Sequence, residues 1–292
     1  MGHDVRWLDS KDDLAGIDFS GTFFITEHEA AKDGMPIRSD CFYAVHGANN
    51  DAACQEGLQS VKWVGWNVYL DNPPGVNTQE NLETWNYQPC SGPRIMLEHE
   101  VPFWPEGKRL DFRWATDQLP HEIQALKPQA VLGRGSRVIN WVGTVWFVND
   151  KELAAFNKAC GENHIQFRPV GAGQRGVVSI EENIRLVRES YMAPAISGSH
   201  HNVEGYAPCR IFKNISYGQM GITNNPFVNR LFQNKLIFEP DPYKLFYVAK
   251  ERLESLDVKE IHDLMDVVAA RHTYMNRIVN LLTAAGHLGW DV

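Results

Sequence analysis

The chain has 292 residues, of which 43% are hydrophobic, and these values predict a globular protein of two domains. Its formal charge of -8, with no block of Lys or Arg, argues against a nucleic-acid binder that relies on a basic stripe. Five cysteines without a C-x-x-C pair, and no apolar run of about 18 residues, favour a reducing compartment and no transmembrane segment, so we expect a cytoplasmic protein.

Short apolar segments in the amino-terminal half predict strands at Val5–Leu8, Gly21–Thr26 and Cys41–Val45. Segments that are apolar on both faces suit a buried parallel sheet. Glu27 follows the second strand and His46 the third. Ligands of open α/β sheets bind beyond the carboxyl ends of strands, so both are candidate site residues. The alternative is that each caps a neighbouring helix.

Residues 60–112 show little periodicity and predict loops and short strands. The Trp rings of this segment suit either the core or the face of a sugar: Trp63, Trp66, Trp85 and Trp104. Pro120 then interrupts the pattern, and a polar stretch follows it. We therefore expect a domain boundary near 125–136, with domains at 1–130 and 131–292.

Strands and helices alternate through the carboxyl half. Between 138 and 225 the order is β-α-β-α-β-α-β, which is typical of a Rossmann-like parallel sheet. The glycines at 171, 173 and 176 match a dinucleotide fingerprint only superficially, because no Asp or Glu stands near the end of a following strand to hold a ribose. A strand at 236–238, a helix over 241–253 and one long helix from Val258 to Ala285, long enough to bridge two domains, complete the chain.

The segment 204–223 is the most informative part of the sequence. A glycine loop leads into a helix whose first turn carries Pro208 and Arg210 and which ends at Gly218. Proline at a helix start leaves the remaining amides of that turn available to an anion. A guanidinium there is unfavourable beside the positive end of the helix unless an anion joins it. This pattern predicts a phosphate site; the alternative is an ordinary αβ unit with a surface arginine.

The phrase Arg210-Ile-Phe212-Lys213-Asn-Ile-Ser-Tyr-Gly218, followed by Gly221-Ile-Thr223-Asn224, resembles the donor-binding domain of GT-B glycosyltransferases, in particular CgeB-like members of the group 1 type. The resemblance runs across about 138–285, is specific in 204–224 and is generic elsewhere. Ile25–Glu27 and Trp114–Pro120 resemble the acceptor domain more loosely. The resemblance to GT-B glycosyltransferases implies an α/β, GT-B-like fold of two Rossmann-like domains facing a cleft, with the terminal helix bridging them.

This resemblance implies a metal-independent glycosyltransferase of polysaccharide biosynthesis. A sugar would move from a nucleotide-diphosphate donor to a hydroxyl of a glycan or other acceptor, with no cofactor beyond the nucleotide sugar. The donor site implied by the resemblance comprises Gly143, Thr144, Glu204, Tyr206, Arg210, Lys213, Asn214, Tyr217 and Thr223.

The resemblance implies a different role for each group of these residues. Gly143, Thr144 and Arg210 would approach the diphosphate, and Glu204 the hydroxyls of the donor sugar. Lys213 departs from the pattern, because many members carry there a Glu that binds the ribose. Either a neighbour such as Asn214 recognises the ribose, or donor affinity is weak, or the lysine reaches a phosphate.

Transfer with inversion also needs a base at the acceptor hydroxyl. We expect His46 in this role, with Glu27 or Asp117 as alternatives, and we expect no metal. A metal cluster of Glu27, His28 and His46 is the competing interpretation.

The amino terminus reads like the end of a first helix followed by a second strand, so we expect an amino-terminally truncated member or a short form. Two other classes compete with a glycosyltransferase. One is a sugar-nucleotide epimerase or hydrolase of the same architecture, and the other is a noncatalytic fragment that binds a nucleotide sugar.

Overall fold

A computed structural model describes residues 4–9, 11–27, 34–68, 92–132, 135–145, 149–171, 178–203 and 205–291. The chain divides into two compact units, each mixed α/β with mostly parallel strands, which confirms the α/β part of the expected fold class. Unit 1 comprises Met1–Asn67, Gln79–Asp111 and Val279–Val292, and unit 2 comprises Val68–Thr78 and Phe112–Ile278. The division after Asp111 precedes the boundary expected between 130 and 131, and the carboxyl terminus belongs to unit 1.

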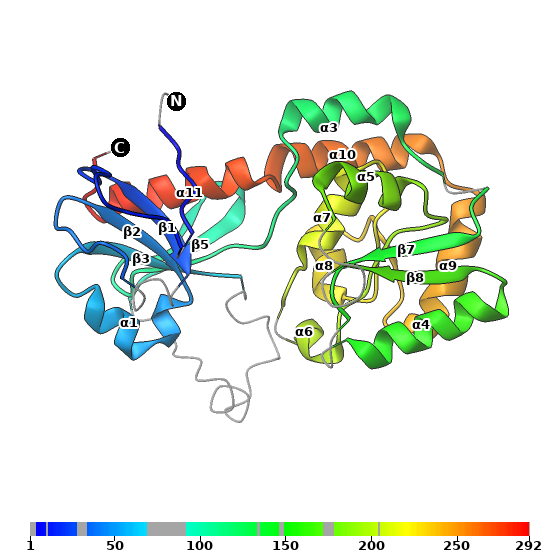
Figure 1. The fold of residues 1–292 in the computed structure, drawn as a ribbon. Helices are drawn as coiled ribbons and strands as arrows, with labels where there is room; N and C mark the ends of the chain where they lie inside the picture. The colour runs from blue at the N-terminus through cyan, green and yellow to red at the C-terminus, as the bar shows by residue number, and fades with distance from the viewer. Residues whose placement is uncertain are drawn as a thin grey trace. The chain divides into compact units, whose positions relative to one another are not determined.

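The sheet of unit 1 has six strands in the order β1-β2-β3-β6-β5-β4 (Figure 1). Their bounds are β1 (Phe23–Glu27), β2 (Phe42–His46), β3 (Lys62–Asn67), β4 (Ile95–Leu97), β5 (Val101–Trp104) and β6 (Arg109–Asp111). The first three strands and β6 are parallel, and β5 and β4 extend the sheet as antiparallel strands. Short helices accompany them: η2 (Ala48–Asn50), α1 (Ala52–Gly57) and η3 (Glu98–Glu100).

Two of the three strands expected at the amino terminus are confirmed as β1 and β2, whereas the prediction of a strand at Val5–Leu8 is wrong. Val5 and Trp7 are 87% and 93% exposed, and residues 4–9 pair with no strand among the described residues. A short apolar segment without a partner strand gains neither ladder hydrogen bonds nor burial, so its residue types alone do not make it a strand.

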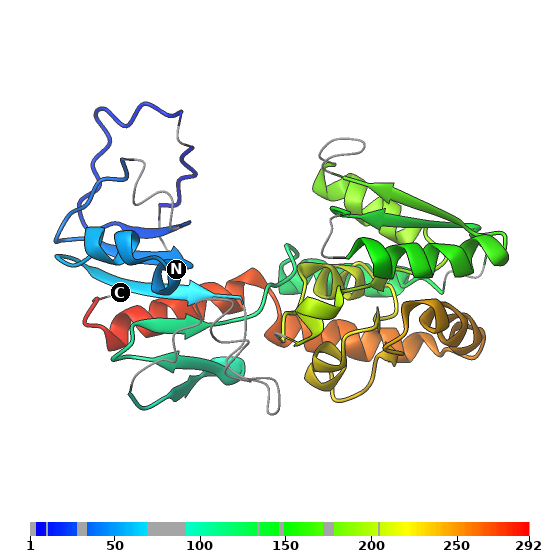
Figure 2. The same ribbon diagram turned by 90° about the horizontal axis from the view of Figure 1, so that it is seen from below.

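The tryptophans of residues 60–112 that the structure describes belong to the core of unit 1. Trp63, Trp66 and Trp104 are each no more than 7% exposed, while Trp85 lies outside the described residues. The last turns of the chain pack on the same sheet, where Trp290 contacts Phe42 with ring centres 5.9 Å apart. Figure 2 shows the carboxyl-terminal helix running alongside these strands.

Unit 2 contains the alternating elements expected from the sequence. Its strands are β7 (Val138–Val142), β8 (Gln166–Val170), β9 (Pro194–Ala195), β10 (Ile222–Thr223) and β11 (Ile237–Phe238). Its helices are α3 (Pro120–Leu126), η4 (Lys127–Gln129), α4 (Asp150–Glu162), α5 (Ile180–Arg188), α6 (Ser199–Val203), α7 (Cys209–Ser216), α8 (Pro226–Leu231), α9 (Pro242–Glu254) and α10 (Val258–Arg271). The last helix, α11 (Tyr274–His287), is shared between the two units.

The sheet of unit 2 is divided where a continuous Rossmann-like sheet was expected. Strands β7 and β8 form one parallel pair, and β9, β10 and β11 form a second parallel group. Two hydrogen bonds join β7 to the segment before β9 instead of a ladder: the backbone amide of Asn140 donates to Ser190 Oγ at 2.9 Å, and the backbone amide of Tyr191 donates to the Val138 carbonyl at 2.7 Å. The two groups therefore stay together without regular pairing.

The helix expected over 258–285 is two helices, α10 and α11. Helix α10 ends before Thr273, because the backbone of Thr273 forms a β-bridge with Thr116. In this bridge the Thr116 amide donates to the His272 carbonyl at 2.9 Å. Asn276 starts the second by accepting hydrogen bonds from the Thr273 amide at 2.9 Å and the Thr273 hydroxyl at 2.8 Å. Helix α11 begins in unit 2, and its residues from Val279 onwards belong to unit 1.

Candidate functional site

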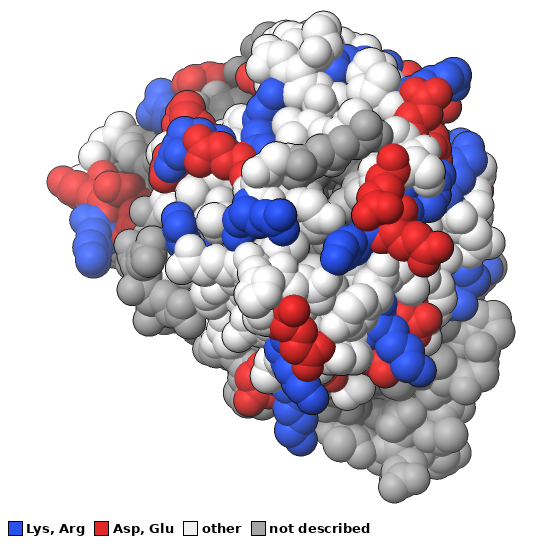
Figure 3. Space-filling model, turned by 90° about the vertical axis from the view of Figure 1, so that its right-hand side faces the viewer, with Lys and Arg blue, Asp and Glu red and all other residues white. Residues whose placement is uncertain are grey.

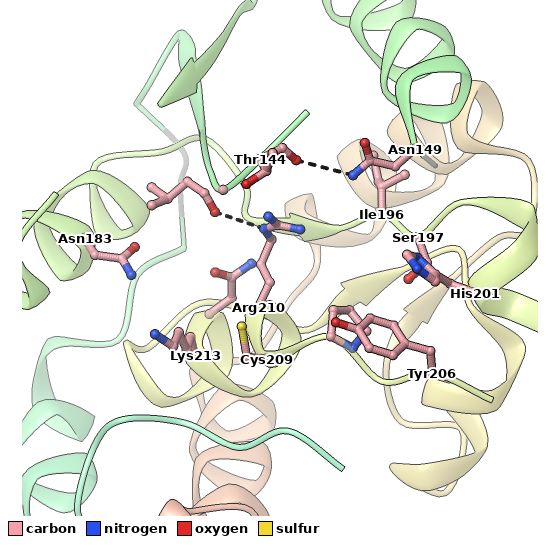
Figure 4. Close-up of a pocket in the computed structure, with 14 residues that line it drawn as sticks. Thr144, Asn149, Asn183, Ile196, Ser197, His201, Tyr206, Cys209, Arg210 and Lys213 are labelled. Carbon is pink, nitrogen blue, oxygen red and sulfur yellow. Dashed lines mark hydrogen bonds between the residues drawn. The ribbon is translucent and has the colours of Figure 1, made fainter. Parts of the chain in front are cut away.

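A pocket of about 420 Å³ lies in unit 2, at the carboxyl end of β7 and the amino end of α7 (Figure 4). It brings together most of the residues expected at a donor site: Gly143, Thr144, Tyr206, Arg210, Lys213 and Asn214. Strand β7 is buried, and the chain leaves it through Gly143; α7 begins after Pro208 at its N-cap. The pocket thus joins the end of a parallel strand to a helix N-terminus, two places that favour anions.

Arg210 is held in place by a backbone carbonyl and an aromatic ring. Its Nε donates to the Val142 carbonyl at 3.1 Å, and its guanidinium carbon lies 3.6 Å from the centre of the Trp141 ring. Burial lowers the pKa of Arg210 to about 10, which leaves the group charged at neutral pH. Among the described residues no carboxylate lies within ion-pair distance of it, so its charge is available to an anion in the pocket.

Gly143 makes room for this guanidinium. Its φ of 146° is a conformation that side chains rarely adopt, and a Cβ at this position would lie 1.8 Å from Arg210 Nη2. The Gly143 amide donates to the Val170 carbonyl at 2.8 Å, which ties the turn to β8. Gly171 follows β8, and a Cβ there would lie 3.2 Å from the Gly143 amide nitrogen. Close approach of these two turns therefore requires glycine.

Lys213 lies one turn after Arg210 on α7 and is paired with an acidic side chain. Its Nζ is 2.8 Å from Asp117 Oδ2. The same carboxylate accepts from the Tyr217 hydroxyl at 2.8 and 3.1 Å. Asp117, an alternative candidate for the catalytic base, belongs to unit 2 and has two donors on its carboxylate. Both of its oxygens are therefore engaged by side chains of α7 and its C-cap.

The opposite part of the pocket is aromatic. Tyr206 stacks on His201 with ring centres 4.5 Å apart and an angle of 29° between the planes. The Tyr206 carbonyl accepts from Asn225 Nδ2 at 2.9 Å, which anchors the loop before α7. Figure 4 shows Tyr206 and His201 on one side of the pocket and Lys213 on the other, with Arg210 between them.

Two of the expected donor residues that the structure describes, Tyr217 and Thr223, are not among the pocket's lining residues. Tyr217 and Thr223 are fully buried, and the Thr223 hydroxyl donates to the Ala195 carbonyl at 3.1 Å. Glu204 lies outside the described residues. Asn214 does line the pocket, but its amide group donates to the Ala193 carbonyl at 2.8 Å, so it also fixes the helix to the chain before β9.

Sequence reasoning missed several polar residues that line the pocket. Asn149 precedes α4, Asn183 lies on α5, and Ser197 follows β9. Ser197 is 3% exposed, and its hydroxyl has no hydrogen-bond partner among the described residues. Asn149 and Ser197 both follow strands of unit 2, and this position was the signal that could have identified them.

Glu27 and His46 come together in unit 1. They are paired residues at the ends of β1 and β2, and His46 Nδ1 lies 2.6 Å from Glu27 Oε2. The imidazole also stacks on Trp66 at the end of β3, with ring centres 4.3 Å apart. A carboxylate at Nδ1 orients the imidazole and favours the tautomer in which Nε2 can accept a proton.

No group of three or more His, Cys, Asp or Glu side chains in the described ranges is arranged to hold a metal ion, and His28 lies outside those ranges. Within the described part of the chain, no helix combines the length and apolar character that crossing a membrane requires. Acidic and basic side chains are interspersed on the face shown in Figure 3.

The sequence matches no protein-family model and no curated protein.

Proposed function

We propose that the pocket of unit 2 binds the diphosphate of a nucleotide sugar, and that the protein is a glycosyltransferase. The observation that carries this proposal is the guanidinium of Arg210, which is charged, faces the pocket and has no carboxylate partner among the described residues. It lies beside a helix start without a side-chain cap. A buried cation and free amides are favourable together when an anion neutralises them.

The chemistry of sugar transfer needs such a site. When the glycosidic bond to the diphosphate breaks, negative charge develops on the departing group, and preorganised donors lower the barrier by stabilising it. Arg210 supplies a fixed charge, and Lys213 lies one turn away on the same face of α7. The stacked rings of Tyr206 and His201 offer an apolar surface for a base or a sugar.

We further propose His46 as the base that accepts the proton of the acceptor hydroxyl. The carboxylate of Glu27 lies at its Nδ1 and orients the imidazole. His46→Gln keeps a polar side chain but removes the base. We expect it to lower turnover by about 100-fold or more while leaving the affinity for the donor unchanged. Turnover equal to that of the wild type would remove His46 from this role.

Binding of the donor is tested with Arg210→Met and a panel of nucleoside diphosphates and their sugar esters. Loss of a charged hydrogen bond should weaken binding by roughly 1.5–3 kcal/mol, measured by titration calorimetry. Arg252→Met is the matched control, because it removes the same charge from an exposed pair with Glu260, and it should bind as the wild type does.

Catalysis is tested by measuring release of nucleoside diphosphate from labelled nucleotide sugars with and without a mixture of hydroxyl acceptors. A transferase gives release that depends on the acceptor. Release without an acceptor would indicate a hydrolase instead, and binding without turnover a noncatalytic protein. A wild-type protein that binds no member of the panel contradicts the proposed function.

A further inference from the structure

Lys213 has a partner that a ligand would have to displace. It lines the pocket, yet its ammonium group is 2.8 Å from Asp117, whose side chain is 16% exposed. As long as this pair is closed, its two charges cancel. The pocket then presents one uncompensated cation among its described lining residues, the guanidinium of Arg210.

We propose that Asp117 is a positioning residue which holds Lys213 beside the pocket and releases it only to a ligand with a second anionic group. The inference rests on the proposed function and specifies the ligand: a diphosphate engages both Arg210 and Lys213, whereas a monophosphate engages Arg210 alone. Arg210 and Lys213 are three residues apart on α7, and side chains at this spacing project from the same face of a helix.

The surroundings of Asp117 allow the lysine to leave. After release, the carboxylate would still accept the hydrogen bond from the Tyr217 hydroxyl. Burial, together with the neighbouring Asp117 charge, raises the pKa of Tyr217, so the phenol keeps its proton and remains a donor. Asp117 therefore does not become an unsatisfied buried charge when Lys213 turns to the ligand.

Hydrogen bonds of the neighbouring residue Thr116 also hold Asp117 in position. Thr116 Oγ1 is 2.7 Å from Ser216 Oγ, and the Ser216 hydroxyl donates to the Lys213 carbonyl at 2.9 Å. These contacts tie the chain around Asp117 to the last turn of α7. Because the carboxylate is fixed and the lysine side chain is long, exchange between Asp117 and a phosphate needs only rotation of the lysine side chain.

Competition with Asp117 makes the pocket selective. A ligand recruits Lys213 only when its own attraction exceeds that of a fixed carboxylate, so a single weak anion leaves the pair closed. Removing the carboxylate charge should increase affinity for anions in general and reduce discrimination between pyrophosphate and orthophosphate. A purely structural ion pair predicts no change in either property.

The test measures binding of inorganic pyrophosphate and orthophosphate to the full chain by calorimetry. Asp117→Asn keeps the shape and the acceptor for Tyr217 but frees Lys213, and it should bind pyrophosphate about threefold to tenfold more tightly, with a steeper dependence on salt. Lys213→Met should bind pyrophosphate more weakly. The double variant should match Lys213→Met, because Asp117 acts through the lysine.

Tyr217→Phe is the control, since it removes a hydrogen bond to Asp117 but keeps the ion pair, and it should not bind more tightly. Unchanged or weaker binding by folded Asp117→Asn overturns the inference, as does tighter binding that persists without Lys213. If Asp117→Asn does not fold, Lys213→Met decides: a loss confined to pyrophosphate supports the inference, and equal losses for both anions overturn it. Wild-type protein that binds no pyrophosphate overturns the proposed function as well.

Discussion

The guanidinium of Arg210 lies over the indole ring of Trp141 and donates to the Val142 carbonyl. Stacking on Trp141 and donation to Val142 fix its plane, so the remaining N–H groups face the pocket in a defined direction. Lysine has no planar group to stack in this way. Lysine would therefore not replace arginine at position 210, and the geometry of the site depends on the guanidinium.

Substitution of Gly143 tests how closely backbone and guanidinium are matched. Gly143→Ala introduces strain at φ of 146° and a Cβ that collides with Arg210 Nη2. We expect the free energy of unfolding to fall by about 1–3 kcal/mol, measured with denaturant, and the affinity for diphosphate to fall with it. Gly161→Ala is the control, since this helical glycine has free space around it and alanine should be neutral or slightly stabilising.

Unchanged stability and unchanged affinity in Gly143→Ala would contradict this account of the turn. A change in stability alone would mean that Arg210 moves aside without loss of function.

The sequence predicted part of the candidate site and not the rest. The motif around Arg210 identified a phosphate-binding helix start, because proline, arginine and glycine have local conformational and electrostatic consequences. It did not predict that Tyr217 and Thr223 are buried, since Tyr217 follows α7 and Thr223 lies in β10, where tertiary packing decides burial. Asn149, Asn183 and Ser197 come from three other segments, and only the fold brings them to the pocket.

At the scale of elements, the break between α10 and α11 decides how the chain passes from unit 2 back to unit 1. Thr273 is fully buried, and its hydroxyl and amide both donate to Asn276 Oδ1. The apolar pattern continues in phase on both sides of the break, which is why the sequence indicated one helix. A tertiary contact with Thr116 interrupts it.

Thr273→Ala should lower the free energy of unfolding by about 1 kcal/mol, the usual worth of a side chain at a helix start. Thr273→Ser retains the hydroxyl and should lose less. Chemical denaturation measures both. Equal stabilities for Thr273→Ala and the wild type would show that the hydroxyl does not stabilise the start of α11.

At the scale of the whole molecule, the parallel strands of both units follow from their apolar segments, whereas the division of the chain does not. Pro120 and the polar stretch after it suggested a boundary near 130, but Ile123 of α3 is buried in the core of unit 2. The polarity of the local sequence does not reveal that Ile123 packs in the core of unit 2. The return of Val279–Val292 to unit 1 is equally a property of the fold rather than of the local sequence.

The measurement that tests the central claim most directly is protection of Cys209 from alkylation by a nucleoside diphosphate. Cys209 lines the pocket and is partly exposed, whereas Cys41, Cys54 and Cys160 are buried, so peptide mass spectrometry can follow its labelling separately. At a ligand concentration ten times its Kd, we expect the labelling rate to fall about tenfold, in proportion to the unoccupied fraction. Labelling of Cys209 at an unchanged rate under saturating ligand would contradict binding of the diphosphate in this pocket.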